Sequence, residues 1–518
     1  MERRNFLLNV GGILGGLGAI KSFSSFAPVR ENFPQYSEFQ NSSRSDIMNR
    51  IGVPIVVKPV LLYNLLERKE ADSWREWGGL KTPDDVDKEI SRINEELRKL
   101  EINSDFGMKL LPLFEVNSDE KATEAVDSDY DVLLLYAAGT AGTRMYDAKW
   151  INMLTNTGKD VVMFLRHKSG PVYLWYEIAH TKLLRSASDN FTHPSMDLED
   201  IVVDDYNQVL FRLRALYGLK NVKNTTILAV GGMGSWGGYT ELARKTVANV
   251  WQLNVKELET GEFVSLVERK ISDRSSMKAA ERDTQDLISH HSTLSVNTDK
   301  EFIVRTFILY YVMKDLMNSY GAEGITINGC MGISTSVLTT PCLAFSLVND
   351  EGLMAFCESD FNVIPCGILL RHISGKPVFL NNPTFPHDGI TTCAHCHSPR
   401  RMNGKDLEPT HIYTHIESDY GAAPKVEFRK GQLITSIVPN FQQDKWIGFS
   451  GNIIAHPFYP ICRSQFNCTI DGDWKKLLQN MQGFHWMTCY GNYLQEIGYA
   501  AKKAGIQFDN ISTGQWPP

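Results

Sequence analysis

Three apolar runs of strand length constrain the fold of this chain more than any other feature of its sequence. They span Asp131–Ala138, Val161–Leu165 and Ile227–Val230, and helical stretches separate them. A strand that is apolar throughout is buried on both faces, and helical connections between such strands give a parallel sheet. The pattern therefore predicts parallel α/β layers in the first part of the chain.

Glycine-rich turns follow the first and the third of these runs, at Gly139–Gly142 and Gly231–Gly238. Such turns can hold phosphates or sugars at the carboxyl edge of a sheet. The second turn lacks the full spacing of a dinucleotide-binding loop. Glycines that adopt positive φ in tight turns explain the pattern equally well. We therefore predict no nucleotide site.

Local signals predict one amphipathic helix with particular clarity. Thr82-Pro83-Asp84-Asp85 supplies an N-cap residue, a proline at the first helical position and acids in the first turn. Apolar residues then recur at intervals of four and three positions, as one face of a helix requires. They are Val86, Ile90, Ile93, Leu97 and Leu100.

Other elements follow from similar patterns. Phe302–Tyr320 is apolar on nearly every face and precedes Gly321, which predicts a buried helix. Asn492–Ala504 predicts a closing helix that stops at Gly505. Two strands are predicted at Ile51–Tyr63 and Ile325–Ile327.

The second half of the chain has a different sequence pattern. From Thr391 onward, short β-like runs alternate with turns, which predicts a β-rich domain built as a barrel or a sandwich. The clearest runs are Val426–Arg429, Gln432–Val438, Trp446–Ser450 and Cys462–Ile470.

The length of 518 residues is too great for one core and predicts roughly three domains. We place them at 49–172, 173–351 and 352–518, after a polar linker at 28–48. The formal charge of −7 gives no basic face, so nucleic acid is an unsuitable partner.

The N-terminus carries an export signal. Arg3-Arg4-Asn5-Phe6-Leu7 is a twin-arginine start, and the apolar, glycine-rich Phe6–Ile20 follows it. Ser25-Phe26-Ala27 offers a cleavage site of small residues. We interpret residues 1–27 as a signal for export of a folded protein to the periplasm. A retained N-terminal anchor is the alternative.

Two acids stand directly after an apolar approach in the segment Cys357–Leu380. Glu358 and Asp360 precede a mostly apolar run of the same segment. Acids so close to a buried run are costly unless a metal, a network of sugar hydroxyls or a basic neighbour pairs with them. A surface turn with solvated acids is the other interpretation.

Cys393-Ala394-His395-Cys396-His397 is the sharpest local motif. It has the C-x-x-C-H form of covalent haem attachment, with His397 as the axial ligand. Haem attachment needs an unfolded segment, however, which conflicts with export of a folded domain. Zinc is a further alternative, although no second Cys/His pair follows at zinc-finger distance. The nine cysteines, odd in number, do not indicate a disulfide framework.

Three other positions are candidates for chemistry. His485 lies between Phe484 and Trp486, where a histidine is commonly a packing residue. His415 and Glu417 point the same way if their segment is a strand. Arg463 supplies a guanidinium suited to a carboxylate or a set of hydroxyls.

Taken in order along the chain, these motifs resemble the L-fucose/L-arabinose isomerase-like superfamily, especially its shorter members. The resemblance covers most of the chain after the signal. Its blocks are Trp74–Gly79, Thr340–Ser346, Asn349–Gly352, Cys357–Asp360, Ala394–Cys396 with Ser398-Pro399, His415–Ser418, Cys462–Gln465, Gly483–His485 and Tyr490–Asn492.

The resemblance implies two Rossmann-like α/β domains followed by a β-rich, barrel-like C-terminal domain. It implies a homo-oligomer whose substrate is a small-molecule sugar and whose cofactor is a divalent metal such as Mn²⁺. Enzymes of this kind interconvert aldoses and ketoses through an enediol. The metal holds two sugar oxygens while a carboxylate moves a proton between neighbouring carbons. A sugar-binding protein without catalysis is the alternative.

Carried over residue by residue, the resemblance makes Asp360 and His485 metal ligands. Asp360 and Glu358 become the catalytic acids, and His395 and Arg463 bind the sugar. The family's third ligand is a Glu upstream of the Asp, but the corresponding stretch here, Cys330–Leu338, contains no acid. Glu358, His395 or a water must therefore replace it, with Glu358 as a substitute acid or as a residue that orients a ligand.

Overall fold

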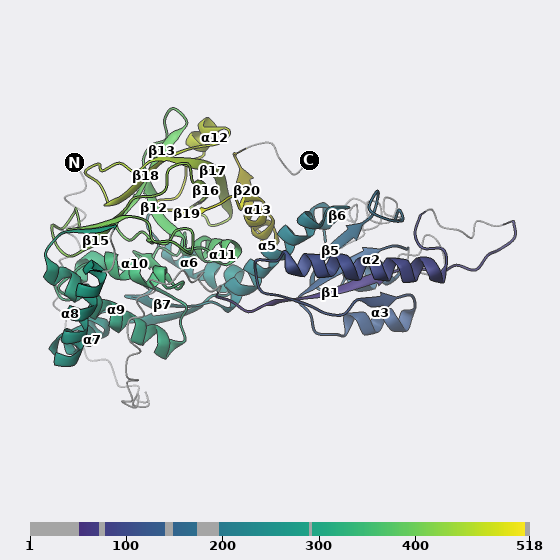
Figure 1. The fold of residues 1–518 in the computed structure, drawn as a ribbon, viewed down its shortest axis with the longest axis horizontal. Coiled ribbons are helices and arrows are strands. Elements are labelled where there is room, and N and C mark those ends of the chain that lie inside the picture. Colours follow the sequence, from purple (N-terminus) through teal and green to yellow (C-terminus); the bar gives the residue numbers. More distant parts are fainter. Residues whose placement is uncertain (1–50, 72–77, 140–148, 174–195, 290–292, 513–518) are drawn as a thin grey trace. The chain divides into compact units, whose positions relative to one another are not determined.

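The structure is a computed structural model that describes residues 51–71, 78–139, 149–173, 196–289 and 293–512 (Figure 1). They lie in one compact unit and form a mixed α/β fold with parallel sheets and a closed antiparallel barrel. The predicted signal at 1–27 and the predicted linker at 28–48 lie outside the described residues. Within the described residues, every helix is too short or too polar to cross a membrane.

The first parallel sheet forms from the strands of the N-terminal region (Figure 1). Its order is β2-β1-β4-β5-β6, and β3 also pairs with β1. The bounds are β1 Ile55–Leu62, β2 Met108–Leu110, β3 Phe114–Val116, β4 Val132–Ala137, β5 Asp160–Leu165 and β6 Ile201–Val203. The predicted strands at 51–63, 131–138 and 161–165 are confirmed as β1, β4 and β5. Because β6 pairs with β5, this sheet extends beyond residue 172, where we had placed a domain boundary.

Helices α2 (Pro83–Ile102), α3 (Asp119–Val126) and α4 (Lys149–Thr155) belong to this region. The predicted amphipathic helix is confirmed as α2. The Thr82 side chain accepts a hydrogen bond from the Asp85 N–H, and Asp85 accepts one from the Thr82 N–H, which completes a capping box. The helix buries Val86, Ile93, Leu97 and Leu100 in the core.

The second parallel sheet has the order β11-β10-β7-β8. Its strands are β7 Thr226–Val230, β8 Asn254–Leu258, β10 Gly324–Ile327 and β11 Met354–Cys357. From β7 the chain first adds β8 on one side and later adds β10 on the other. The order therefore reverses between β7 and β10, and ligands of open α/β sheets bind at such a point, beyond the carboxyl ends of the strands.

The helices between these strands range from short turns to the long, buried α9. They are α6 Thr240–Thr246, the π-helix η3 Val247–Trp251, α7 Thr260–Ser272, α8 Arg274–Ser289, α9 Lys300–Tyr320, the 3₁₀-helix η4 Cys330–Ile333 and α10 Cys342–Asp350. The predicted buried helix is confirmed as α9, which ends where Gly321 adopts a left-handed φ of 59°. Only a residue without a Cβ adopts that conformation freely.

The segment Cys357–Leu380 contains a helix, α11 (Ile364–Ser374), in which every residue is buried. It packs against α5 (Tyr206–Asn224) and α13 (Leu494–Lys503), which is the predicted closing helix. Gly218 of α5 permits the close approach, because a Cβ there would meet the Ile373 side chain at 2.5 Å. The apolar run after Asp360 is therefore the helix that joins the sheets to the barrel.

Six antiparallel strands close into a barrel. They follow the order β16-β19-β12-β13-β18-β17, and β17 returns to pair with β16. Their bounds are β12 Phe379–Pro383, β13 Ile390–His395, β16 Leu433–Pro439, β17 Lys445–Ala455, β18 Ser464–Thr469 and β19 Trp486–Tyr490. Of the two architectures predicted for this half, the structure is thus a barrel. Its core includes Phe379, Phe466 and Trp486.

Smaller elements complete the described fold. A three-stranded sheet joins β9 (Leu294–Asn297), β14 (Thr410–Tyr413) and β15 (Ala423–Val426). The strand β20 (Gln507–Asn510) pairs with β17, and the 3₁₀-helix η2 (Leu198–Asp200) and helix α12 (Trp474–Gln479) lie in connections. The run predicted at Val426–Arg429 is a strand only at Val426, where β15 ends.

Candidate functional site

The loop that follows β11 bears the first pair of site residues. Glu358 and Ser359 have φ angles of 63° and 51°, a left-handed conformation that costs residues with a Cβ about 1–3 kcal/mol each. Hydrogen bonds hold the loop in place. The Ser359 N–H donates to Thr326 Oγ1 at 2.9 Å, and Ser359 Oγ donates to the Gly232 carbonyl at 2.8 Å. Glu358 and Asp360 are therefore positioned by contacts with the ends of both β7 and β10.

Asp360 is a fully engaged carboxylate. Its side chain is 1% exposed. Oδ1 accepts hydrogen bonds from the backbone N–H groups of Trp236 at 3.2 Å and Asn362 at 3.1 Å. Oδ2 lies 2.7 Å from His485 Nδ1. Because both oxygens already have partners within the protein, Asp360 orients His485 and is poorly placed to bind a metal directly.

His485 lies between the two acids. Its Nδ1 donates to Asp360, so its Nε2 is the nitrogen that faces Glu358, with 3.2 Å between Nε2 and Glu358 Oε2. Nε2 is buried, and it forms an ion pair with Glu358 when the ring is protonated. Burial alone would lower the pKa of His485. The contacts with Asp360 and Glu358 have a larger and opposite effect, so the pKa is raised to about 9. A cation bound at Nε2 would replace the second proton of this imidazole.

Glu358 is the accessible carboxylate of the pair, with a side chain that is 24% exposed. Burial raises its pKa, but the hydrogen bond with His485 and the neighbouring imidazoles of His395, His485 and His415 lower the pKa below its ordinary value. Glu358 is thus ionised at neutral pH and lies among three imidazoles. A base or a metal ligand requires this state.

His395 has a defined tautomer. Its Nδ1 accepts the Cys396 N–H at 3.0 Å, and a backbone N–H can only donate. The proton of the neutral ring is therefore on Nε2. Burial lowers the pKa of His395 to about 4, so the ring is neutral at pH 7. Such a ring presents an N–H donor, which suits the sugar-binding role predicted for it.

His415 joins this group, but Glu417 does not. His415 is 4% exposed, and burial, followed by the charge of Arg463, lowers its pKa. Strand β14 ends at Tyr413, so residues 415–417 lie in a turn and Glu417 is exposed. We expected the two side chains to point the same way only if this segment is a strand. Because the segment is a turn, the expectation does not apply. His415 was visible in the sequence as part of this motif.

Arg463, predicted to bind sugar, is held by local contacts. Its Nε donates to the Thr414 carbonyl at 2.8 Å. Its guanidinium carbon lies 5.5 Å from the centre of the Tyr413 ring and 5.6 Å from that of Phe458. These contacts fix the turn that carries His415, so Arg463 acts on the site through that turn.

A metal ion would find two possible donor groups here. One ligand atom from each of Glu358, His395 and His485 lies within 4.8 Å of the others. Cys357, His395 and His397 form a second group by the same measure. His485 Nε2, once it has lost its proton, and the ionised Glu358 are donors that suit a divalent cation such as Mn²⁺. In this geometry Glu358 is the accessible carboxylate beside His485 Nε2, and Asp360 lies behind the ring at Nδ1.

Two exposed aromatic rings lie beside His485. Trp236 and Phe484 stack with 5.2 Å between ring centres and an interplanar angle of 22°. They are 40% and 42% exposed, and Trp236 also meets the His485 ring edge-on at 6.2 Å. The sequence analysis missed Trp236. Its position inside a glycine-rich turn after a buried strand was the available signal.

The motif Cys393–His397 is divided between separate environments. Residues three positions apart on an extended chain face opposite ways. Cys393 lies in the barrel core beside Cys468, whereas Cys396 packs with Cys342 and Cys462. One haem would have to reach both thiols, so this geometry lends no support to covalent haem attachment.

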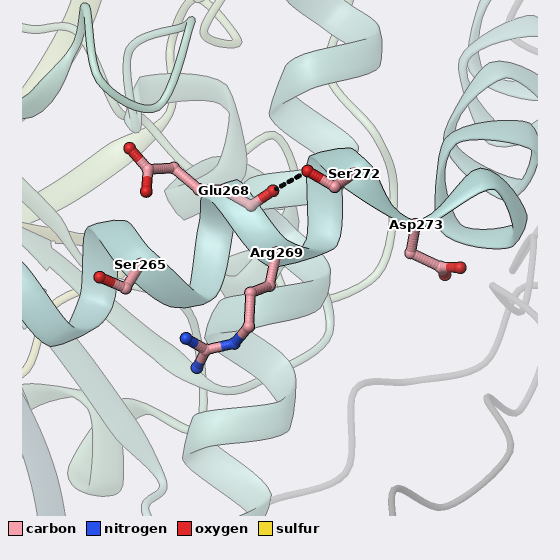
Figure 2. A pocket seen from close by; sticks show the side chains of 5 residues that line it. All are labelled: Ser265, Glu268, Arg269, Ser272 and Asp273. Carbon is pink, nitrogen blue, oxygen red and sulfur yellow. Dashed lines mark hydrogen bonds between the residues drawn. The ribbon is translucent and has the colours of Figure 1, made fainter.

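A surface hollow on α7 lies outside this group (Figure 2). Ser265, Glu268, Arg269, Ser272 and Asp273 line it. Ser272 Oγ donates to the Glu268 carbonyl of the same helix at 2.9 Å, and Asp273 accepts from the N–H groups of Ser275 and Ser276 at the start of α8. These polar groups serve the ends of two helices.

No protein-family model matches the chain, and no curated protein sequence matches it significantly.

Proposed function

We propose that this protein is a metal-dependent aldose–ketose isomerase that acts on a monosaccharide. The observation that carries the proposal is that the His485 ring lies between the carboxylates of Asp360 and Glu358. In this arrangement a buried acid orients an imidazole whose other nitrogen faces a second, accessible acid. Carboxylate–histidine–metal units in proteins have this form.

The fold supports the proposal. We interpret the two parallel sheets as two Rossmann-like domains that precede the barrel. Glu358 lies directly after β11, and the loop around it contacts the ends of β7 and β10, between which the strand order reverses. This is where open α/β sheets bind ligands. His395 and His485 come from the barrel half, so the sheet and the barrel both contribute to the site.

Each residue then has a separate task. Glu358 and His485 Nε2 would hold the divalent cation, and Asp360 would fix the His485 ring through Nδ1. A bound divalent cation polarises the neighbouring oxygens of the sugar. The second oxygen of Glu358 would take a proton from one sugar carbon and return it to the next. The Nε2–H of His395 would donate a hydrogen bond to a sugar oxygen.

The stacked rings of Trp236 and Phe484 support a sugar as the ligand. Both rings are substantially exposed next to the site, and exposed apolar surface of this kind is typical of ligand-binding positions. The C–H groups of a sugar can pack on such rings while its hydroxyls face the acids and imidazoles.

A sugar-binding protein without catalysis is the second candidate. One observation favours it. The stretch 330–338 contains no acid, and Asp360 has both oxygens engaged, so Glu358 alone remains to move protons. A second proton-transfer group typically contributes about 10²–10⁴-fold to the rate.

Deuterium exchange distinguishes the two candidates. The protein is incubated in D₂O with Mn²⁺ and a panel of pentoses and 6-deoxyhexoses, and NMR follows C2 deuteration and ketose formation. We expect exchange with at least one sugar, its loss in Glu358→Gln and its retention in Glu427→Gln. Glu427 is a matched control because its carboxylate also contacts an imidazole, that of His411, at 3.1 Å. Thermal stabilisation by a sugar without exchange would support the binding protein instead.

A further inference from the structure

We propose that Cys330, Cys357 and His397, together with His395, form a second and softer metal site that binds zinc or a similar thiophilic divalent cation. This inference does not depend on the proposed isomerase activity. It concerns two thiols and the His397 imidazole, which the reaction above leaves unused, and it shares His395 with the isomerase site.

The distances suit a zinc ion. Cys357 Sγ and one ring nitrogen each from His395 and His397 lie within 4.8 Å of one another. Cys330 Sγ lies 3.6 Å from Cys357 Sγ. With Zn–S bonds near 2.3 Å and Zn–N bonds near 2.0 Å, ligand atoms in a tetrahedral site are separated by about 3.3–3.8 Å. The pair of sulfurs is already at this separation.

The fold itself brings these residues together. Cys357 is the last residue of β11, and Ile327, the last residue of β10, pairs with it in the sheet. Cys330 begins the 3₁₀-helix that follows β10, so both thiols lie at one sheet edge. His395 ends β13 of the barrel, and His397 comes two positions later. An ion here would tie the second sheet to the barrel.

One ring nitrogen of His397 lacks a hydrogen-bond partner among the described residues. His397 is 0% exposed and lies between the rings of Phe345 and Phe379. Since His395 Nδ1 accepts hydrogen bonds, His397 Nδ1 at 2.9 Å must donate to it. The lone pair of His397 is then on Nε2, which makes no hydrogen bond within the described residues. An unsatisfied buried polar group is destabilising, and ligation would remove that cost.

The other cysteine clusters provide a contrast. Cys393 pairs with Cys468 inside the barrel, and Cys396 packs with Cys342 and Cys462. Among the residues that the structure describes, the groups of possible metal ligands include Cys357 but none of these five thiols. Cys330 is also outside those groups and reaches the site through Cys357 Sγ, at 3.6 Å. Two thiols beside two imidazoles are a donor set that zinc prefers over manganese.

A cobalt titration tests this site in the full chain. Co²⁺ replaces zinc, and cobalt–thiolate bonds give a charge-transfer absorption band that carboxylate and imidazole ligands do not give. The reduced, metal-free protein is titrated with Co²⁺, and bound zinc is measured by elemental analysis after expression with zinc. The variants are Cys357→Ser, Cys330→Ser and His397→Ala, with Cys468→Ser as the matched control for a buried thiol outside the site.

We expect the thiolate band and about one zinc per chain in the wild-type protein and in Cys468→Ser. The band should disappear in Cys357→Ser, and affinity should fall at least tenfold in His397→Ala. Glu358→Gln, which removes the accessible carboxylate of the isomerase site, should keep the band. Absence of deuterium exchange in the wild-type protein, with the band present, would thus count against the isomerase alone.

Absence of the band in the wild-type protein, or its persistence in Cys357→Ser, would overturn the proposal. A Cys330–Cys357 disulfide in the protein purified without reductant and with zinc present would do the same. If Cys357→Ser does not fold, alkylation of the wild-type protein provides the test. Zinc should protect Cys330 and Cys357 from alkylation, a chelator should remove the protection, and equal labelling with and without zinc would contradict the site.

Discussion

At the scale of single residues, two acids two positions apart in the sequence have different environments. The Asp360 side chain is almost fully buried and accepts three hydrogen bonds, whereas the Glu358 side chain is accessible and faces imidazoles. The sequence identified both acids but not this difference. The difference depends on the backbone turn at Glu358 and Ser359 and on the loop of Trp236, which is remote in sequence.

The first prediction concerns Asp360→Asn. The amide is a weaker hydrogen-bond acceptor, so His485 loses the charge that fixes its ring and strengthens Nε2 as a ligand. Removal of such a partner typically lowers metal affinity about 10–100-fold. Isothermal titration with Mn²⁺ measures the effect, with Glu427→Gln as the control. An unchanged affinity would show that the ion does not bind through His485.

The second prediction concerns Asp204, which has a left-handed φ of 60°. Its carboxylate accepts hydrogen bonds from the N–H groups of His167, Lys168 and Ser169 and from Ser169 Oγ. Although burial raises its pKa, the bonds from Ser169, His167 and Lys168 lower the pKa to about 2. The ionised group thus stabilises the fold above its unfolded pKa near 4, and this contribution is lost as the pH falls toward 2.

We expect Asp204→Asn to lower the free energy of unfolding by about 1 kcal/mol at pH 7, after allowance for the exposure of this loop. The difference from the wild-type protein should shrink as the pH is lowered from 5 toward about 2. Denaturant unfolding across this pH range provides the measurement. A difference that is constant with pH would mean that the carboxylate charge is not responsible.

At the scale of elements, local sequence signals were sufficient to predict those helices and strands whose ends or burial are determined by neighbouring residues. The capping box before α2, Gly321 after α9 and the apolar runs of β4 and β7 all mark elements that the structure confirms. The segment 364–374 was harder, because an element that is buried on every side has no periodic pattern. The expectation for His415 and Glu417 depended on a strand, which the sequence could not establish, and β14 ends at Tyr413, where Arg463 from a distant part of the chain contacts the Thr414 carbonyl.

The third prediction concerns the buried network that joins α2 to β5. Arg166 is fully buried, and its Nε lies 2.5 Å from Glu89 Oε1 while its Nη2 lies 2.6 Å from Glu96 Oε2. Arg166→Met would leave Glu96 without its cation and Glu89 with Arg92 alone, at a cost of about 3–5 kcal/mol. The exposed pair of Arg244 and Glu257 is the matched control, and Arg244→Met should cost less than about 1 kcal/mol. Chemical denaturation of the two variants measures both effects, and equal losses would contradict the account.

The fourth prediction concerns the bend of the barrel strand β17, whose pairing with β18 shifts register between Ile453 and Ala455. A Cβ at Gly451 would overlap the carbonyl oxygen of Thr469, which is backbone and cannot turn away. Gly451→Ala should therefore lower stability by at least about 1–3 kcal/mol. Gly261 has open space around its Cβ position, so Gly261→Ala should be tolerated. Thermal unfolding compares the two, and a stable Gly451→Ala variant would show that the strands can separate.

At the scale of the whole molecule, the site exists only because distant parts of the chain meet. Glu358 follows a strand of the second sheet, while His395 and His485 belong to the barrel half. The sequence alone places neither the barrel closure between β16 and β17 nor the proximity of these residues. The order of motifs suggested the group through resemblance. The tautomers of the histidines, the hydrogen bonds of Asp360 and the ring nitrogen of His397 that lacks a partner among the described residues could be found only in the structure. The oligomeric state stays a prediction.

The most direct measurement of the central claim is the position of a manganese ion by anomalous diffraction from crystals of the protein soaked with Mn²⁺. We predict one anomalous peak at bonding distance from a Glu358 carboxylate oxygen and from His485 Nε2, with Asp360 Oδ2 still hydrogen-bonded to His485 Nδ1. A peak coordinated directly by Asp360, or a peak away from His485, would contradict the account.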